Sequence, residues 1–265
     1  SGELDGVTVS CTSTGIGCPS AAIAVEELHS LGADTFLRVG TSGSMQSHIK
    51  PGSIGVISGA IRDEGTSRHY LPLEFPAVAD LDVTIALREA AAASGHPWYL
   101  GVAQSKDSFY GQHEPARMPI ADDLARRWKA WMAGGAICSE MEAATIFIVA
   151  ATLRARAGGA MLILGNPDQR PMTKEEEAAC DVDRVIDASV DGLRRLIAAD
   201  RARGASTSPI ATRGPSRSWR SKARRSRWPA RWISATTSRG RATSCSCRTA
   251  RARSSRATTT TRSQS

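Results

Sequence analysis

The chain has 265 residues and carries 34 Lys and Arg against 26 Asp and Glu, so its formal net charge is +8. The charge is uneven, because residues 201–265 hold 17 basic and no acidic residues, whereas residues 1–200 carry a net charge of −9. No apolar run approaches the roughly 20 residues of a membrane-spanning helix, and Ser1 to Ser10 shows no secretory leader. The six cysteines form no C-x-x-C pair, which argues against a zinc site or a disulfide framework, so we expect a cytoplasmic protein.

Residues 1–200 alternate between strand-like and helix-like patterns. A β-branched run leads into a glycine-rich turn, and a helical apolar repeat follows that Pro19 opens and Gly32 ends. With the next strand this forms a βαβ unit, which implies parallel strands and a right-handed crossover. The expected strands are 7–10, 35–39, 53–58, 100–105 and 161–164. The expected helices are 20–31, 83–93, 122–132, 142–155 and 182–199. Thr173 and Glu176 form a predicted capping box on a short helix before the last of these. This alternation predicts a doubly wound α/β domain, whose ligands bind beyond the carboxyl ends of the strands.

The first candidate loop follows the strand at 35–39. Arg38 supplies a cation, and residues 40–43 supply small residues with free backbone N–H groups and two hydroxyls. This combination suits an oxyanion such as phosphate. Taken alone, the pattern favours a structural arginine beside a plain turn.

The second candidate loop is the run 139–142, which precedes a strongly apolar stretch. Glu140 and Glu142 are two positions apart and cannot share a helix face, so one of them belongs to the loop while the other begins the helix. A carboxylate at a helix start interacts favourably with the helix dipole, and the pattern alone favours that role for Glu142. The functional alternative is that Glu142 accepts hydrogen bonds from the paired hydroxyls of a ribose.

The third candidate loop spans residues 106–113. Gln112 offers an acceptor and a donor together, as the edge of a planar heterocycle requires. Phe109 offers a face on which a ring or a sugar can pack. The alternative is a loop whose aromatic side chains fold onto the core.

Six motifs occur in order between residue 3 and about residue 199. They are 3–6, 13–20 with 24–28, 35–43, 72–80, 109–112 and 139–144. In this combination the chain resembles the uridine phosphorylases of the nucleoside phosphorylase family. The resemblance implies a three-layer α/β domain over residues 1–200, with a central, mostly parallel mixed sheet flanked by helices. It also implies a homo-oligomer, usually a hexamer built of dimers.

The activity that the resemblance implies is phosphorolysis of uridine to uracil and ribose 1-phosphate. Inorganic phosphate is then a co-substrate, and no metal or organic cofactor is required. Arg38 and Glu142 are the implied catalytic residues. The implied ligands are Arg38, Gly40 and Thr41 for phosphate, Thr41, Met141 and Glu142 for ribose, and Phe109, Gln112, His113, Arg117 and Asn166 for the base.

The chain departs from the family pattern at several positions. Glu114 stands where the family has an arginine beside the base-reading glutamine, so His113 and Arg117 are the candidates for that role. Asn166 favours a pyrimidine, because relatives that cleave purine nucleosides carry a proton-donating aspartic acid in this loop. Asp168 keeps the purine nucleoside alternative open. A strand, a G-D-P-x-R turn and an arginine given to the neighbouring subunit, which precede the first motif in the family, are absent from the sequence, so we expect weak or no activity of the chain as given.

The basic segment 201–265 holds 24 Ser or Thr beside its 17 basic residues and shows no hydrophobic period, so its composition predicts disorder. Trp219, Trp228 and Trp232 among these charges suit a nucleic-acid-binding arm, which would make the chain a basic-tailed binding protein. The same composition is typical of a GC-rich coding sequence translated out of frame or past its stop. We favour the second interpretation, and nucleic acid is an expected partner only under the first.

Overall fold

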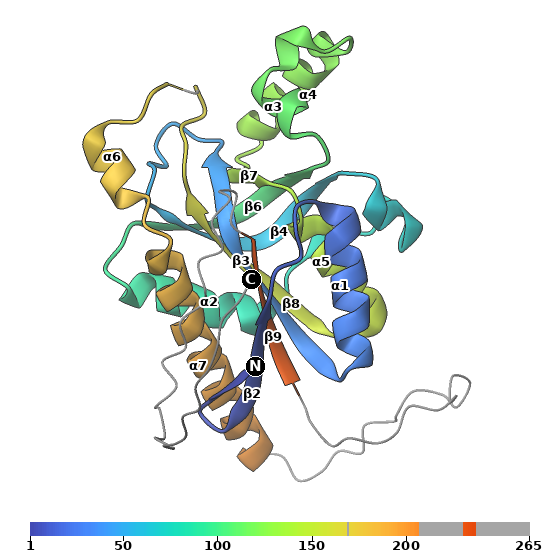
Figure 1. Cartoon of the computed structure of the whole chain (residues 1–265), viewed down its shortest axis with the longest axis vertical. Coiled ribbons are helices and arrows are strands. Elements are labelled where there is room, and N and C mark those ends of the chain that lie inside the picture. The colour runs from blue at the N-terminus through green and yellow to red at the C-terminus, as the bar shows by residue number, and fades with distance from the viewer. Residues whose placement is uncertain (169, 207–229, 237–265) are drawn as a thin grey trace, which may run out of the picture.

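The computed structural model describes residues 1–168, 170–206 and 230–236 (Figure 1). The strands are β1 (Gly2–Leu4), β2 (Val7–Thr12), β3 (Ala33–Ser44), β4 (Ile54–Asp63), β5 (Ala77–Val78), β6 (Trp98–Lys106), β7 (Cys138–Glu140), β8 (Arg156–Ile163) and β9 (Ala230–Thr236). The α-helices are α1 (Cys18–Ser30), α2 (Leu81–Ala93), α3 (Phe109–His113), α4 (Ala121–Ala133), α5 (Ala143–Leu153), α6 (Lys174–Ala179) and α7 (Asp183–Ser206), with short 3₁₀ turns η1 (Thr66–His69) and η2 (Pro115–Arg117).

The strands form one mixed sheet that closes on itself. β3 pairs with β8 in parallel and with β7 in antiparallel orientation, while β4 pairs with β6 in parallel and with β8 in antiparallel orientation. The parallel pair of β6 and β7 completes a ring of five strands. The predicted α/β fold with a central mixed sheet is confirmed, and the closure places the ends of β3, β6 and β7 beside one another.

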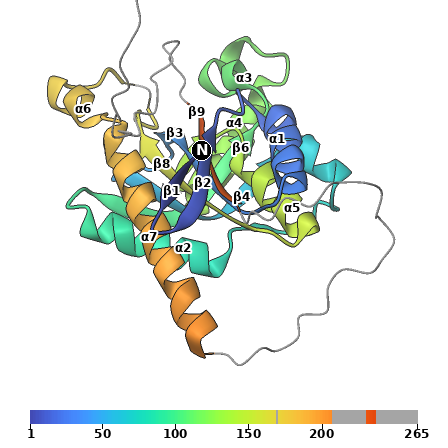
Figure 2. The same ribbon diagram turned by 60° about the horizontal axis from the view of Figure 1, so that its bottom comes forward.

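Two pairs of helices cover the sheet from opposite sides. Figures 1 and 2 show α1 and α5 on one side and α2 and α7 on the other. Helix α5 is buried over most of its length, which explains why its sequence is apolar all round rather than amphipathic. Phe147 and Ile146 of α5 belong to one hydrophobic cluster, and Leu87 of α2 and Leu196 of α7 belong to the other.

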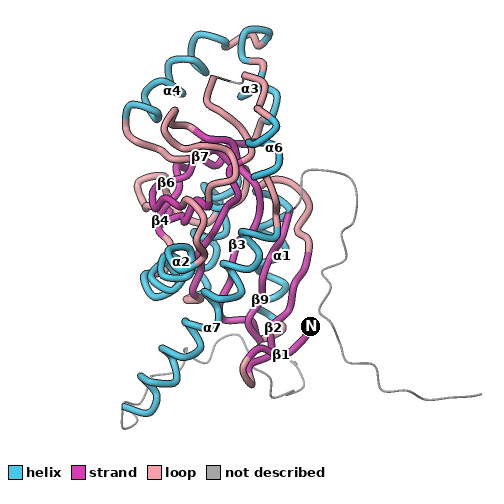
Figure 3. The backbone as a smooth tube through the Cα atoms, turned by 90° about the vertical axis from the view of Figure 1, so that its left-hand side faces the viewer, coloured by secondary structure: helices cyan, strands magenta, loops and turns pink. Residues whose placement is uncertain are grey.

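Helices α3 and α4 stand at one end of the molecule, clear of the sheet (Figure 3). Helix α4 has no buried residue, and it follows β6 through α3 and η2. This arrangement puts the third candidate loop, which begins with Lys106, above the carboxyl ends of the strands.

The predicted strands and helices are all present, with ends that differ by a few residues. The capping box is confirmed, because the Thr173 hydroxyl accepts from the Glu176 N–H and the Glu176 carboxylate accepts from the Thr173 N–H. The predicted loop at 40–43 is wrong, since these residues lie inside β3. Small residues suggested a turn, but β8 pairs as far as Ser42 and β7 pairs at Gly43, so neighbouring strands continue to supply hydrogen-bond partners. For the same reason residues 138–140 form β7 rather than a loop.

The basic segment differs in part from its prediction of disorder. Helix α7 continues to Ser206, and β9 lies between β2 and β3, in parallel with both. A strand in this place satisfies the backbone N–H and C=O groups of two neighbours at once, a long-range effect that composition does not report. The rest of the segment, including Trp219 and Trp228 of the nucleic-acid interpretation, lies outside the described residues. In the part of the chain that the structure describes, none of the helices combines the length and apolar character needed to cross a membrane.

Candidate active site

Arg38 lies in the middle of β3 and is buried. Its Nη2 atom donates to Glu142 Oε2 over 2.6 Å, and Nη1 donates to the Val39 carbonyl oxygen over 2.9 Å. Its Nε atom has no hydrogen-bond partner among the described residues and lies 3.8 Å from Glu140 Oε2. Because a guanidinium carries five N–H donors, Arg38 has donors left for an anion.

Gly40 lies directly beneath the Arg38 guanidinium. A Cβ atom at this position would lie 2.7 Å from Arg38 Cζ and closer still to Nη1. Such distances are far below van der Waals contact, so only glycine leaves room for the guanidinium where it is. Gly40 thus leaves room for the Arg38 guanidinium, and its role as a phosphate ligand stays a prediction.

Glu142 is buried and precedes the first residue of α5. Its Oε1 atom accepts from the Gly17 N–H over 2.6 Å, while Oε2 accepts from Arg38. Gly17 has a φ of 95°, a conformation that favours glycine, so the glycine-rich turn before α1 aims this N–H group. Each carboxylate oxygen has a further lone pair, so Glu142 can accept two more hydrogen bonds.

The neighbouring carboxylate, Glu140, has a structural role. It lies on β7, and it accepts from the Ser105 hydroxyl and from the backbone N–H groups of Glu142 and Ala143, the latter two at 2.8 and 2.9 Å. Burial and the charge of Glu142 raise the pKa of Glu140, while Arg38 opposes this shift. Glu140 therefore fixes the start of α5, and with it the position of Glu142.

A cavity of about 620 Å³ brings most of the predicted phosphate and ribose ligands together. A second cavity of about 360 Å³ adjoins it and holds predicted base ligands. The first is lined by Arg38, Thr41, Phe109, Met141 and Glu142, the second by Gln112 and Asn166, and His113 lines both. Cavities of this size hold a small organic ligand.

The aromatic groups of the third loop form one wall of the larger cavity. The Phe109 ring lies 4.2 Å from the His113 imidazole, centroid to centroid. Burial, with a smaller contribution from the charge of Lys106, lowers the pKa of His113, so its ring is neutral near pH 7. Phe109 is half exposed, with its free face available for stacking.

Arg117 is not brought to the predicted base site. Its Nε lies 2.9 Å from Glu114 Oε2, its guanidinium lies over the Tyr110 ring, and its side chain is 57% exposed. Arg117 lines neither of the two cavities in the described part of the chain. Glu114 directly precedes the turn η2, so its carboxylate lies three residues before Arg117 and pairs with the guanidinium.

Asn166 lies in the loop after β8. Its Oδ1 atom accepts from Arg170 over 3.3 Å, and Arg170 is itself paired with Glu176 at 2.6 Å. Its Nδ2 atom is buried and has no partner among the residues described. An unsatisfied buried amide donor at a cavity wall suits a carbonyl oxygen of a ligand.

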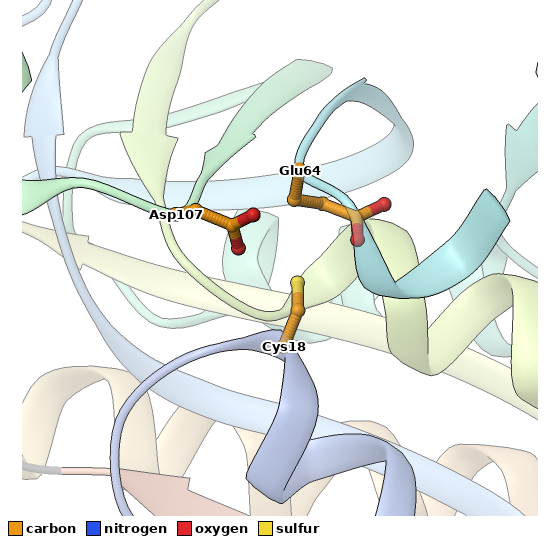
Figure 4. Close-up of side chains that lie close together, drawn as sticks. All are labelled: Cys18, Glu64 and Asp107. Atoms are coloured by element: carbon orange, nitrogen blue, oxygen red, sulfur yellow. The ribbon is translucent and has the colours of Figure 1, made fainter. Parts of the chain in front are cut away.

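Cys18, Glu64 and Asp107 point toward one another beside this site, with their ligand atoms within 4.8 Å (Figure 4). Each of these three side chains has a hydrogen-bond partner within the protein. Cys18 Sγ donates to the Met141 carbonyl over 3.1 Å, Glu64 accepts from the Ser67 N–H over 2.9 Å, and Asp107 accepts from the Gly65 N–H over 2.9 Å. Burial raises the pKa of the Cys18 thiol, so it is a neutral donor rather than a thiolate ligand. These contacts tie α1 to the segment that holds Met141, and the loop after β4 to the loop after β6.

Comparison with known proteins supports a common origin of this arrangement. Residues 1–198 match the model of the phosphorylase superfamily. The chain is similar to a uridine phosphorylase of Treponema pallidum (strain Nichols), with 46% identity over 76% of the chain and 78% of the relative. It is similar to a uridine phosphorylase of Escherichia coli (strain K12), at 40% over 74% and 78%. A guanosine phosphorylase of Halorubrum lacusprofundi is 37% identical over 74% of the chain and 75% of the relative.

Proposed function

The chain belongs to the phosphorylase superfamily, and we propose that it cleaves uridine with inorganic phosphate, releasing uracil and ribose 1-phosphate. The observation that carries the proposal is the buried contact of Arg38 with Glu142 at the wall of one cavity. It places a cation with free donors beside a carboxylate with free lone pairs. A phosphate oxygen and a ribose therefore meet at adjacent atoms of one site. The residues that we assign to this site all lie within a catalytic domain of residues 1–200.

Phosphate binds to N–H donors that Arg38 keeps free, with Thr41 of the same strand beside it. Charge-assisted hydrogen bonds of this kind are short and directional, so they orient the anion as well as bind it. Glu142 accepts from the two ribose hydroxyls, and Met141 packs against the sugar. Holding both reactants in contact replaces a bimolecular encounter by an oriented one.

The reaction then exchanges one bond at C1′ for another. A phosphate oxygen forms a bond to C1′ as the C1′–N1 bond breaks, and the electron pair of that bond leaves with uracil. HPO₄²⁻ brings one proton into the reaction, and the uracil anion takes up one proton. The step therefore needs no external acid. Gln112 and Asn166 bind the edge of the base, and Phe109 packs on its face. Inorganic phosphate is the co-substrate, and the proposed chemistry uses no metal and no organic cofactor.

The direct test is the dependence of uracil release on phosphate. We expect the purified chain of residues 1–265 to release uracil from uridine in phosphate buffer, at the weak rate predicted for it, and to form ribose 1-phosphate in equal amount, as measured by chromatography. Without phosphate, release is expected to stop, because no other nucleophile is held by Arg38. Equal release in a phosphate-free buffer would assign hydrolysis instead and contradict the proposal. Guanosine, offered as a competing substrate, tests the alternative that the chain cleaves purine nucleosides.

Asn166 gives a second prediction at this site. We expect Asn166→Ala to raise KM for uridine about tenfold, since one hydrogen bond to a buried carbonyl is lost. KM for phosphate is expected to stay unchanged, because the cavity that holds Asn166 does not include Arg38. Initial rates with each substrate varied in turn measure both constants. A rise in KM for phosphate alone would contradict this prediction, because Asn166 would then act at the phosphate end of the site.

We propose that the protein forms a homo-oligomer, a hexamer built of dimers. We also propose that it is located in the cytoplasm. Support for association comes from large apolar side chains exposed at the surface, including Ile23 at 61% on α1 and Leu31 at 69% at the end of that helix. Exposed apolar groups that cluster favour a protein–protein contact. Light scattering of the purified chain measures the mass, and a monomer at micromolar concentration would contradict this proposal.

A further inference from the structure

Lys106 is a buried cation that the mechanism above leaves without a task. It is the last residue of β6 and is only 6% exposed. It lines the larger cavity with Arg38, the smaller cavity with Gln112, and a third cavity of about 490 Å³ under α4. Its position is therefore the junction between the ribose end and the base end of the site.

The ammonium group of Lys106 is held by a chain of polar contacts. Its Nζ donates to Ser139 Oγ over 2.7 Å and to the Glu140 carbonyl over 3.5 Å. The Ser139 hydroxyl in turn donates to Gln104 Oε1 over 2.6 Å, and Gln104 Nε2 donates to Asp63 Oδ2 over 2.8 Å. Because Ser139 gives its proton to Gln104, its oxygen is fixed as an acceptor for Lys106.

One donor of Lys106 remains unused. An ammonium has three N–H groups, and two of them have partners among the described residues. Burial lowers the pKa of Lys106, while the charges of Glu140 and Glu142 oppose the shift. Desolvation of a cation is unfavourable, so an apolar side chain would serve the fold at lower cost.

The other cations near the base end are engaged elsewhere. Arg117 is paired with Glu114 at the surface, and Arg170 is paired with Glu176. His113 is the remaining titratable group shared by both cavities, and its lowered pKa leaves it neutral. Within the described residues, Lys106 is thus the buried cation that faces the base end.

We propose that Lys106 donates its free N–H to a carbonyl oxygen of the departing base and stabilises the base as an anion. This inference rests on the proposed phosphorolysis. As the C1′–N1 bond breaks, its electron pair moves to N1 and is delocalised onto the ring carbonyl oxygens. Lys106 stays protonated throughout, and the proton that the released anion takes up is balanced by the one that HPO₄²⁻ brings into the reaction. The substrate class is a nucleoside whose base carries an oxo group.

The test compares two leaving groups in Lys106→Met, which keeps the length of the side chain and removes the charge. We expect kcat/KM for uridine to fall about 100-fold, as for a lost charge-assisted hydrogen bond. For 5-fluorouridine the loss is expected to be at least fivefold smaller, because fluorine already stabilises the uracil anion. KM for phosphate is expected to stay unchanged. The control is Lys50→Met, which removes an exposed cation and is expected to leave all constants as in the unmodified chain.

The outcomes separate this inference from the proposed function. An equal loss with both nucleosides, or no loss with uridine, would overturn the role of Lys106 while leaving phosphorolysis intact. If the unmodified chain releases no base, the proposed function fails, and calorimetric titration of the same proteins with uracil still decides about Lys106. We then expect at least tenfold weaker uracil binding by Lys106→Met than by Lys50→Met. Equal binding, or no binding of uracil by any of them, would overturn the inference.

Discussion

Replacing Glu142 with glutamine is expected to lower kcat/KM for uridine by about 10²- to 10³-fold. Two charge-assisted hydrogen bonds to ribose hydroxyls become neutral ones, each at a cost of roughly 1–2 kcal/mol. The amide also weakens the 2.6 Å contact to Arg38, so the orientation of bound phosphate suffers in the same variant. Steady-state rates with uridine and phosphate varied in turn measure both effects. Glu142→Ala is expected to abolish measurable turnover.

A second substrate separates the ribose contact from a general loss of structure. 2′-Deoxyuridine lacks one of the hydroxyls that Glu142 is proposed to bind, so the preference for uridine over 2′-deoxyuridine is expected to shrink in Glu142→Gln. This comparison is a double-mutant cycle with one change in the protein and one in the ligand. An unchanged preference would remove the ribose assignment. Glu89→Gln, an exposed carboxylate on α2, is the matched control.

Stability must be measured beside activity, because Arg38 is buried and Glu142 is its partner. Removing one member of a buried ion pair costs about 3–5 kcal/mol, since the other charge remains without compensation. Glu142→Ala is therefore expected to unfold at a lower temperature than Glu142→Gln, which keeps an acceptor for the Gly17 N–H. Thermal unfolding followed by circular dichroism measures the difference.

Sequence patterns predicted the helices well because their signals are local. The cap at Thr173 and the apolar repeat of α7 each lie within a few residues of chain. The end of β3 and the whole of β7 were missed, since their hydrogen-bond partners lie on strands that are distant in the sequence. Strand β9 was missed for the same reason, as its partners are β2 and β3 at the other end of the chain.

The candidate site shows the same division between local and distant causes. The family resemblance, rather than residue type alone, predicted Arg38, Glu142 and Asn166 as ligand-binding groups, and the structure brings them to adjoining cavities. The sequence did not reveal that Gly17 orients Glu142, because 125 residues separate them. Lys106 was also missed as a candidate. The available signal was a lysine at the end of a strand whose last residues are buried, which is unusual unless its charge is used.

Replacing Gly40 with alanine is expected to raise KM for phosphate about 10- to 100-fold without removing any charge from the site. The new methyl group would occupy the space of the Arg38 guanidinium, so this side chain must leave its contacts with Glu142 and the Val39 carbonyl. The loss of one charge-assisted anchor for phosphate accounts for the expected size of the effect. The backbone is expected to stay intact, because the clash is with the flexible end of a side chain.

Gly55→Ala is the matched control for this prediction. Gly55 is also a buried strand glycine, on β4, but a Cβ atom there meets no atom closer than 3.4 Å. This variant adds a methyl group to the closed sheet without a clash at Arg38. Its KM for phosphate is therefore expected to match that of the unmodified chain. If Gly40→Ala keeps the unmodified constant while it folds normally, the guanidinium position seen here is not the one that binds phosphate. An equal rise of KM for phosphate in both variants would instead assign the effect to a disturbed sheet rather than to Arg38.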